Sequence, residues 1–402
     1  MCTVHRVRRS NLSIAMMFLL GNWQSLVLYI AVFGVSAGLV YFGNKAAFSS
    51  KYLKWGVIIS GLALPILLAG IRYRVGKDFA NYAAMLGRVQ EGVPMWPRPI
   101  EPLSSMTIHI SASTGGAVMM FTLFAVVTTV FMYLALRKLL PADPAHIALG
   151  WFMYLCILFP TTLNAVRSGA AVSVAAFALS QLVDTKSKYR LAKFIGWTIV
   201  ACLFHVSALI VLPIGIAVYL ASRGEKLNIK LNLILLSIFT AGAIAFPLFG
   251  GLFAIMPIES IRVYERYFME AGESFYLTKV GLAVAIALAI VLYINIDRSK
   301  KDPKLQVTSA IAMYYIPITI VIGWLAYYTG TSRLAFFLEP IIIVVIVYAV
   351  QRFWGKRRQN YRFALLAIGC VVALSLVLFV RNSIWADTLP YKTIFSQEAR
   401  SR

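Results

Sequence analysis

The sequence is short of acidic residues, cysteines and histidines. Only 15 of its 402 residues are Asp or Glu, against 38 Lys and Arg, so the formal net charge is +23. The four histidines are scattered, and so are the cysteines, at Cys2, Cys156, Cys202 and Cys370. This spacing argues against a disulfide framework and against a metal site built from thiolates or imidazoles. No metal ion or other cofactor is expected.

Charge of either sign is scarce, whereas apolar residues are abundant. Hydrophobic residues make up 60% of the chain and charged residues 13%. A water-soluble domain of this composition could not cover its surface with polar groups, so the chain is predicted to be a polytopic membrane protein. Much of the basic excess lies in short segments between apolar runs, as cytoplasmic loops require, and it does not indicate nucleic-acid binding.

Apolar runs close to the length of a membrane-crossing helix recur along the chain. They predict an all-α transmembrane bundle of about 12 crossings (roughly 10 to 14) that forms one domain over residues 1–402. The run 191–221 is too long for one crossing and is divided at His205. The predicted crossings are 24–43, 55–71, 115–136, 146–162, 168–183, two within 191–221, 231–252, 277–296, 308–329, 334–351 and 363–380.

The segments between these runs form two alternating sets that differ in charge. One set holds 21 Lys and Arg in 59 positions; it comprises 44–54, 137–145, 184–193, 222–230, 297–305 and 352–362. The other holds 13 in about 98 positions; it comprises the loops 72–114 and 253–276, the turns 163–167 and 330–333, and the tail from 381. Because cytoplasmic loops are enriched in cations, the first set is predicted to face the cytoplasm of a bacterium and the second the periplasm or exterior. Arg6, Arg8 and Arg9 conflict with this topology, and a start at Met16 or Met17 would remove the conflict.

The stretch GIRYRVGKDFANY ends the second predicted crossing and opens the longest outer loop. Snorkelling to the interface accounts for Arg72 and Arg74, but less well for Asp78 and Tyr82, which follow at helical spacing. Gly76 allows the chain to turn, and Asp78 could then cap a short interfacial helix. A functional role is therefore expected for Arg72 and Asp78.

Three more polar residues lie at a similar depth in the predicted membrane. Arg167, in FPTTLNAVRSGAAVS, stands between two crossings beside small residues that allow close approach. His205, in ACLFHVSALIVLP, is a lone imidazole that either bonds a buried carbonyl or is functional. Arg333, in TSRLAFFLEP, either forms a structural ion pair with Glu339 or belongs to a site.

Two outer segments carry further candidates. Glu101 lies in RPIEPLSSMTIHIS, whose pattern predicts an amphipathic segment on the outer surface. The loop 253–276 interleaves aromatic and cationic residues, among them Arg262, Arg266 and Tyr267. Such residues suit either a sugar or phosphate ligand or an interfacial anchor.

Guanidinium groups at a membrane edge suit a diphosphate ligand. Each can bind phosphate oxygens in a bidentate way and stays charged at any relevant pH. Several together could stabilise the charge that grows on a diphosphate as a glycosyl bond breaks, while a carboxylate or imidazole takes the proton from an attacking sugar hydroxyl. The sequence has no DxD motif, so arginines are expected to do the work of a divalent cation.

Four stretches resemble motifs of the EpsG-like proteins and occur in the same order. GIRYRVGKDFANY followed by IEPL resembles the first motif; NAVRSGAAVSVAAFAL, ACLFHVSALIVLPI and TSRLAFFLEP resemble the second, third and fourth. The matched positions are Arg72, Asp78, Tyr82, Arg167, His205 and Arg333. The chain departs from the pattern at Lys77, at Ser168 and in the displaced aromatic residues Phe336 and Phe337.

The resemblance implies a Wzy-type polysaccharide polymerase among the GT-C-like membrane glycosyltransferases. Such enzymes join undecaprenyl-diphosphate-linked oligosaccharide repeat units at the periplasmic face of the inner membrane and need no metal ion. The growing glycan moves from its diphosphate carrier to the non-reducing end of an incoming unit. The implied partners are the lipid-linked donor and acceptor, membrane lipids, and chain-length regulator and flippase proteins of the same pathway.

These considerations together give each candidate an expected role. Arg72, Arg167 and Arg333 would bind the donor diphosphate, assisted by Arg74. Asp78 or His205 would be the general base, with Glu101 as the third candidate. Tyr82, Arg262, Arg266 and Tyr267 would contact substrate. Two alternatives stay open: a transporter or flippase for an anionic lipid-linked sugar, which ranks lower because the sequence shows no internal repeat, and a ligase of the same pathway.

Overall fold

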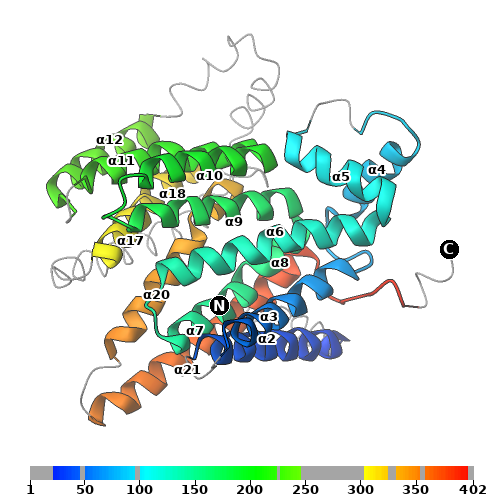
Figure 1. Ribbon diagram of the computed structural model, residues 1–402, viewed down its shortest axis with the longest axis horizontal. Coiled ribbons are helices and arrows are strands. Elements are labelled where there is room, and N and C mark those ends of the chain that lie inside the picture. The colour runs from blue at the N-terminus through cyan, green and yellow to red at the C-terminus, as the bar shows by residue number, and fades with distance from the viewer. Residues whose placement is uncertain are drawn as a thin grey trace, which may run out of the picture.

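The computed structural model describes residues 21–45, 50–95, 100–223, 227–245, 303–324, 332–353 and 358–396, without the side chains of 322–333 and 352–364. Within these ranges the regular structure is helical and contains no β-strand (Figure 1). The predicted all-α fold is confirmed. Six of the described segments are long and apolar enough to cross a membrane, and four shorter apolar helices accompany them.

Several predicted crossings coincide with long helices. α2 (Trp23–Asn44), α3 (Lys51–Gly70) and α6 (Gly116–Leu139) match three of them, and α9 (Val166–Ser180) with η1 (Gln181–Val183) matches a fourth. The described helices do not confirm the predicted total of about twelve. The run 277–296 and the loop 253–276 lie outside the described residues.

Two predicted crossings are interrupted. The run 146–162 is broken at Leu158 into α7 (Pro144–Ile157) and α8 (Phe159–Asn164), because Pro160 suits a new helix start and not a helix interior. The run 191–221 is divided at His205, as predicted. His205 is extended between α10 (Arg190–Phe204) and η2 (Val206–Ile210), which leads into α11 (Val211–Ala221).

The segment 72–114, which was predicted to form a long outer loop, is mostly helical in its described part. It contains α4 (Phe79–Gln90) and α5 (Pro102–Thr114), which pack against each other. The expectation of a short helix after Asp78 is met, although the Asp78 side chain makes no capping hydrogen bond to α4. The other described helices are α12 (Ile229–Ala245), α17 (Pro303–Met313), α18 (Tyr315–Trp324), α19 (Ser332–Phe336), α20 (Glu339–Phe353) and α21 (Arg358–Ala386).

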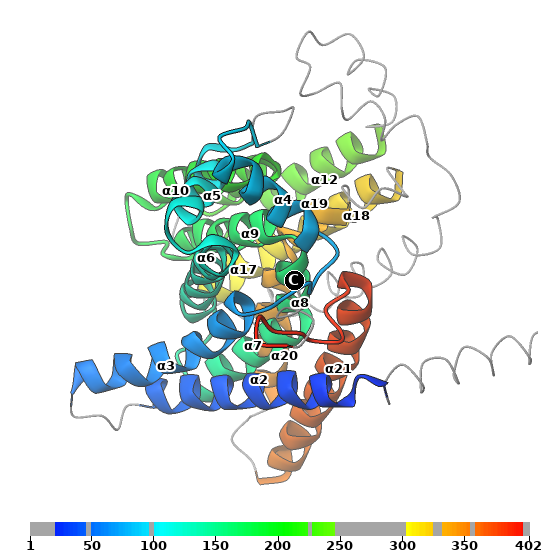
Figure 2. The ribbon, with the colours of Figure 1, turned by 90° about the vertical axis from the view of Figure 1, so that its right-hand side faces the viewer.

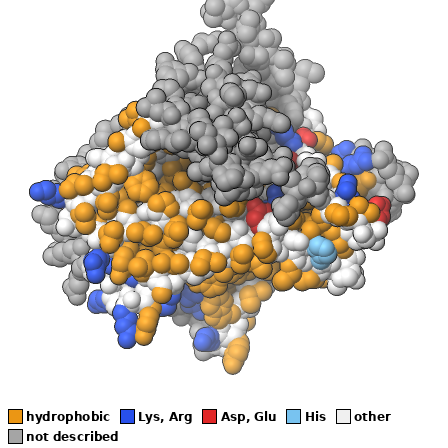
Figure 3. All heavy atoms as spheres, turned by 90° about the horizontal axis from the view of Figure 1, so that it is seen from above, with side chains coloured by type: hydrophobic (Ala, Val, Ile, Leu, Met, Phe, Trp, Pro, Cys, Tyr) orange, Lys and Arg blue, Asp and Glu red, His pale blue; other side chains and the backbone are white. Residues whose placement is uncertain are grey.

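Small residues place α9 at the centre of the bundle. Its Gly, Ala and Ser side chains allow α6 and α10 to pack closely on it, and 89% of the segment Val166–Val183 is buried inside the protein. By contrast, only 11% of the apolar segment Leu365–Ala386 in α21 is buried. Hydrophobic side chains cover much of the face in Figure 3, and Lys and Arg lie mainly towards its margins, as expected for a surface in contact with lipid.

A buried hydrogen-bond chain joins α2, α3 and α7. The indole Nε1 of Trp151 donates to Ser36 Oγ at 2.9 Å, and that hydroxyl donates to the carbonyl of Gly61 at 2.7 Å. The absence of a side chain at Gly61 allows this approach, since an added Cβ would lie 3.0 Å from the Ser36 carbonyl. Figure 2 shows α2 and α3 side by side, with α21 crossing beside α2.

Within each of the two predicted sets of loops, hydrogen bonds hold the loops to one another or to neighbouring helix ends. In the basic set, Lys138 donates to Gln181 at one end of α9, Lys304 donates to the Leu140 carbonyl, and the buried Arg190 donates to the carbonyls of Leu182 and Ser222. In the other set, contacts described below join residues 71–78 to the turn 163–165 and to the C-terminal segment 386–394. This second meeting point lies at the end of the bundle that carries α4 and α5, which we call the α4–α5 end (Figure 1).

The loop 71–78 is fixed from two sides at the α4–α5 end. On one side, the backbone N–H of Asp78 donates to Asn164 Oδ1 at 2.8 Å. On the other, the backbone N–H groups of Tyr73 and Gly76 donate to the carbonyls of Lys392 and Asp387 at 2.9 and 2.8 Å. The sequence offered no pattern that predicts this use of the C-terminal segment as a clamp on the first outer loop.

Gly76 is required by both its backbone angle and its surroundings. Its φ is +94°, and an added Cβ would lie 3.2 Å from the Cα of Asn164 and from the carbonyl oxygen of Leu163. We predict that Gly76→Ala destabilises the protein by about 1–3 kcal/mol. The matched control is Gly87→Ala inside α4, where a Cβ meets nothing within 4 Å. This control should be stabilising by about 0.5–1 kcal/mol. Thermal unfolding of the two detergent-solubilised variants measures both effects, and equal midpoints would refute the role of Gly76.

Candidate functional site

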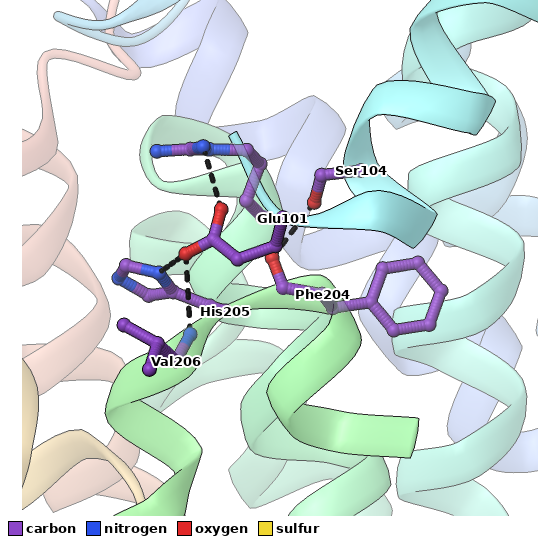
Figure 4. A network of polar contacts seen from close by, with 6 residues as sticks. Glu101, Ser104, Phe204, His205 and Val206 are labelled. Carbon is purple, nitrogen blue, oxygen red and sulfur yellow. Dashed lines mark hydrogen bonds and ion pairs between the residues drawn. The ribbon is translucent and has the colours of Figure 1, made fainter. Parts of the chain in front are cut away.

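Glu101 lies between a guanidinium and an imidazole at the α4–α5 end. Its Oε2 accepts a hydrogen bond from Arg167 Nη1 at 2.9 Å, and its Oε1 contacts His205 Nδ1 at 2.6 Å. The backbone N–H of Val206 also donates to Oε1, at 3.1 Å (Figure 4). The three side chains are only 15–20% exposed. We call Glu101, Arg167 and His205 the Glu101 cluster.

Each member of the Glu101 cluster stands where a helix begins or ends. Glu101 immediately precedes α5, whose first position is Pro102, and Arg167 lies in the first turn of α9. His205 lies at the break after α10, with extended φ and ψ of −160° and 122°. Ser104 Oγ donates to the carbonyl of Phe204 at 2.7 Å and so holds α5 on the end of α10. Helix breaks therefore bring side chains from distant parts of the chain together.

The surroundings keep Glu101 ionised. Burial raises the pKa of its carboxyl, but the hydrogen bond with His205 and the charges of Arg167 and His205 outweigh burial and lower the pKa to about 2. An ionised carboxylate only accepts hydrogen bonds, so Nδ1 of His205 must carry the proton in this contact. In neutral His205 the lone pair is then on Nε2, which has no partner among the described residues.

Arg167 uses only part of its hydrogen-bonding capacity. Nη1 donates to Glu101, whereas its buried Nε has no partner among the described residues. An unpaired buried donor is costly, and a guanidinium can bind a phosphate through two nitrogens at once. The cluster can therefore accept an anion at Arg167 and a proton at His205.

Arg72 does not join the Glu101 cluster. It is 2% exposed, its terminal nitrogens donate to the carbonyls of Ala69 and Leu163 at 2.9 Å each, and its guanidinium lies 4.0 Å from the centre of the Phe121 ring. Burial lowers its pKa to about 10, which leaves it charged at neutral pH. Backbone carbonyls and an aromatic ring therefore surround this cation, and its expected place in a diphosphate clamp of three arginines stays a prediction.

The other candidates from the first motif lie around Arg72. Tyr82 is buried with its ring against Phe121, at a centroid distance of 6.5 Å, so it is not exposed to a substrate here. Arg74 is exposed and lies over the Tyr73 ring. Asp78 is half-buried immediately before α4, and its backbone N–H donates to Asn164 Oδ1 at 2.8 Å.

The remaining candidates are only partly covered by the structure. α19, which carries Arg333, packs against η2, directly after His205. α19 is therefore near the segment that follows His205, while the side chain of Arg333 lies outside the described residues. Arg262, Arg266 and Tyr267 also lie outside them. Among the described residues, no three His, Cys, Asp or Glu side chains gather closely enough to hold a metal ion.

A model of the EpsG family matches residues 54–393, which is most of the chain. The chain belongs to the EpsG family. Together with its apolar helices, this makes it a membrane protein of the polysaccharide-polymerase type, and the family implies glycosyltransferase-like activity. No curated protein and no solved structure matches the chain. The matched range contains the whole Glu101 cluster and the clamp on loop 71–78.

Two features of this EpsG family member were not predictable from motif positions alone. Glu101 ranked third among the candidate bases, yet it is the residue that joins the other two members of the cluster. The downstream IEPL stretch was the available signal, since a proline after an acid marks a helix start. Asn164, which fixes the loop through Asp78, is the first residue of the second motif but was not among its matched positions.

The low pKa of Glu101 predicts how stability depends on pH. Because the folded pKa of about 2 is below that of an unfolded glutamate, about 4.3, the charged contacts stabilise the protein fully above about pH 5. That stabilisation is lost as the pH falls through 4 towards 2. The difference in unfolding midpoint between the wild type and Glu101→Gln should therefore persist from pH 7 to 5 and shrink below pH 4.5. A difference that disappears between pH 7 and 5 would contradict the assigned environment.

Proposed function

We propose that this protein is a glycosyltransferase that joins polyprenyl-diphosphate-linked oligosaccharide repeat units at the periplasmic face of the bacterial inner membrane. The observation that supports it most is the Glu101 cluster in a chain of the EpsG family. In this cluster Arg167 has a hydrogen-bond donor without a partner among the described residues, and Glu101 orients His205. Diphosphate binding and proton removal are the two tasks that this transfer requires of the protein.

Arg167 is the proposed diphosphate ligand, with Arg333 as its partner. The guanidinium of Arg167 is partly buried, and its Nε has no hydrogen-bond partner among the described residues. A phosphate oxygen that binds this Nε would not have to replace an existing hydrogen bond there. α19 carries Arg333 to the neighbouring η2. Arg72 is assigned a structural role instead, since its donors hold the carbonyls of Ala69 and Leu163.

His205 is the proposed general base. Its Nε2 takes the proton from a hydroxyl at the non-reducing end of the acceptor, and the hydroxyl oxygen attacks the anomeric carbon of the donor glycan. The bond from that carbon to the diphosphate oxygen breaks, and its electron pair remains on the leaving polyprenyl diphosphate. Arg167 stabilises this added negative charge. Glu101 orients His205 and stabilises the imidazolium; its own low pKa makes it a weak base.

The reaction is proposed to need no metal ion, with guanidinium groups in the place of a divalent cation. Purified protein in lipid nanodiscs, incubated with a synthetic lipid-linked repeat unit and EDTA, should produce a ladder of lengthened glycans. Movement of the lipid across a vesicle membrane without lengthening would favour a flippase. A single transfer to a different acceptor would favour a ligase.

The role of Arg167 predicts the effect of a conservative change. Arg167→Lys keeps the charge but not the planar fork, so the rate of ladder formation should fall at least about 100-fold. Arg88→Lys is the matched control, because Arg88 is exposed on α4, and it should polymerise at the wild-type rate. Full-length polymer made at an unchanged rate by Arg167→Lys would remove Arg167 from the mechanism.

The choice of base is tested separately. His205→Gln preserves size and hydrogen bonding but cannot accept the proton, so the single-turnover transfer rate should fall about 100-fold or more. Asp78→Asn should lower the rate less, because His205 is the base that Glu101 orients in this proposal. A larger loss for Asp78→Asn than for His205→Gln would assign the base to Asp78.

A further inference from the structure

Glu101 occupies a position in its cluster that also suits an anionic ligand. Its two oxygens accept hydrogen bonds from three donors: Arg167 Nη1 at 2.9 Å, His205 Nδ1 at 2.6 Å and the Val206 N–H at 3.1 Å. A guanidinium, an imidazole and a backbone amide are also donors that bind phosphate oxygens. The resting cluster therefore contains a bound anion that belongs to the protein itself.

Glu101 and Arg167 differ in how completely their hydrogen-bonding groups are paired. Both oxygens of Glu101 are bonded, whereas Arg167 has a buried Nε without a partner among the described residues. A carboxylate that binds Arg167 through one nitrogen is a weaker ligand than a phosphate that binds through two. A diphosphate could therefore replace Glu101 on Arg167 with a net gain in hydrogen bonds.

Glu101 could leave Arg167 without dismantling the site. Ser104 holds α5 to the Phe204 carbonyl independently, at 2.7 Å. The second oxygen of Glu101 has its own contacts with His205 and the Val206 amide.

We propose that Glu101 is a resident anion: it holds Arg167 in the empty site, and an incoming diphosphate replaces it on Arg167 while Glu101 stays on His205. This role of Glu101 rests on the proposed function and adds a preference among anionic ligands. A ligand must compete with a built-in carboxylate, so the site favours a multiply charged diphosphate over a single carboxylate or other monoanion. Binding of the donor also frees Glu101 to act on His205 alone.

Inorganic pyrophosphate is the probe that tests this role. Its dissociation constant is measured by calorimetry with full-length protein in nanodiscs of zwitterionic lipid. Removal of the competing charge in Glu101→Gln should tighten binding at least tenfold, and adding Arg167→Lys to that variant should abolish the gain. Glu91→Gln, at an exposed carboxylate after α4, and Ser104→Ala, which loosens α5 without a change of charge, should bind as the wild type does.

The outcomes distinguish a resident anion from a Glu101 that only holds α5 in place. Binding by Glu101→Gln that is unchanged, weaker or absent overturns the proposal, and so does equal tightening by Ser104→Ala. Glu101→Ala provides a second variant with the same expected gain if the glutamine variant does not purify as a single species. Tighter binding in a protein that makes no glycan ladder keeps the resident anion and rejects the polymerase. A glycan ladder together with unchanged pyrophosphate affinity in Glu101→Gln keeps the polymerase and rejects the resident anion.

Discussion

The contact of one carboxylate with an arginine and a histidine organises the α4–α5 end of this protein. Glu101 reaches Arg167 and His205 across 66 and 104 residues of sequence. Their side chains are at least 80% buried, where an unpaired charge is costly. Because Glu101 supplies a compensating negative charge, the Arg167 guanidinium can stay partly dehydrated at a helix end. That combination suits diphosphate chemistry at the edge of a membrane.

Arg72 and Arg167 are both motif arginines, but they differ in exposure and in hydrogen-bond partners. Arg72 is almost fully buried, donates to two backbone carbonyls and lies on Phe121, so its charge is used to hold the chain. Arg167 is more exposed and has a carboxylate partner, while the buried Nε of each arginine lacks a partner among the described residues. In a chain with far fewer acids than cations, most arginines must pair with carbonyls, rings or water. The cation that obtains a carboxylate is the one that can exchange it for a ligand.

Much of the fold was predictable because hydrophobic length and helix breakers are local properties. The crossings at α2, α3, α6 and α9 follow from apolar runs, and the break at His205 follows from a run too long for one crossing. The break at Leu158 was missed even though Pro160 marks it. The site was only partly predictable. Motif positions identified Arg167 and His205, and the IEPL stretch supplied Glu101 as a third candidate base. Whether a guanidinium meets a carbonyl or a carboxylate depends on three-dimensional packing. The clamp by residues 387–394 is built from backbone hydrogen bonds, which leave no side-chain pattern in the sequence.

Glu101 and Arg167 interact directly. A double-mutant cycle on the free energy of unfolding measures that interaction. The cycle combines Glu101→Gln and Arg167→Met, singly and together, in one detergent at pH 7. Direct contact between two mostly buried charges predicts a coupling energy of at least about 1 kcal/mol. Additive effects, with a coupling energy within about 0.3 kcal/mol of zero, would show that the two side chains do not meet and would contradict the account.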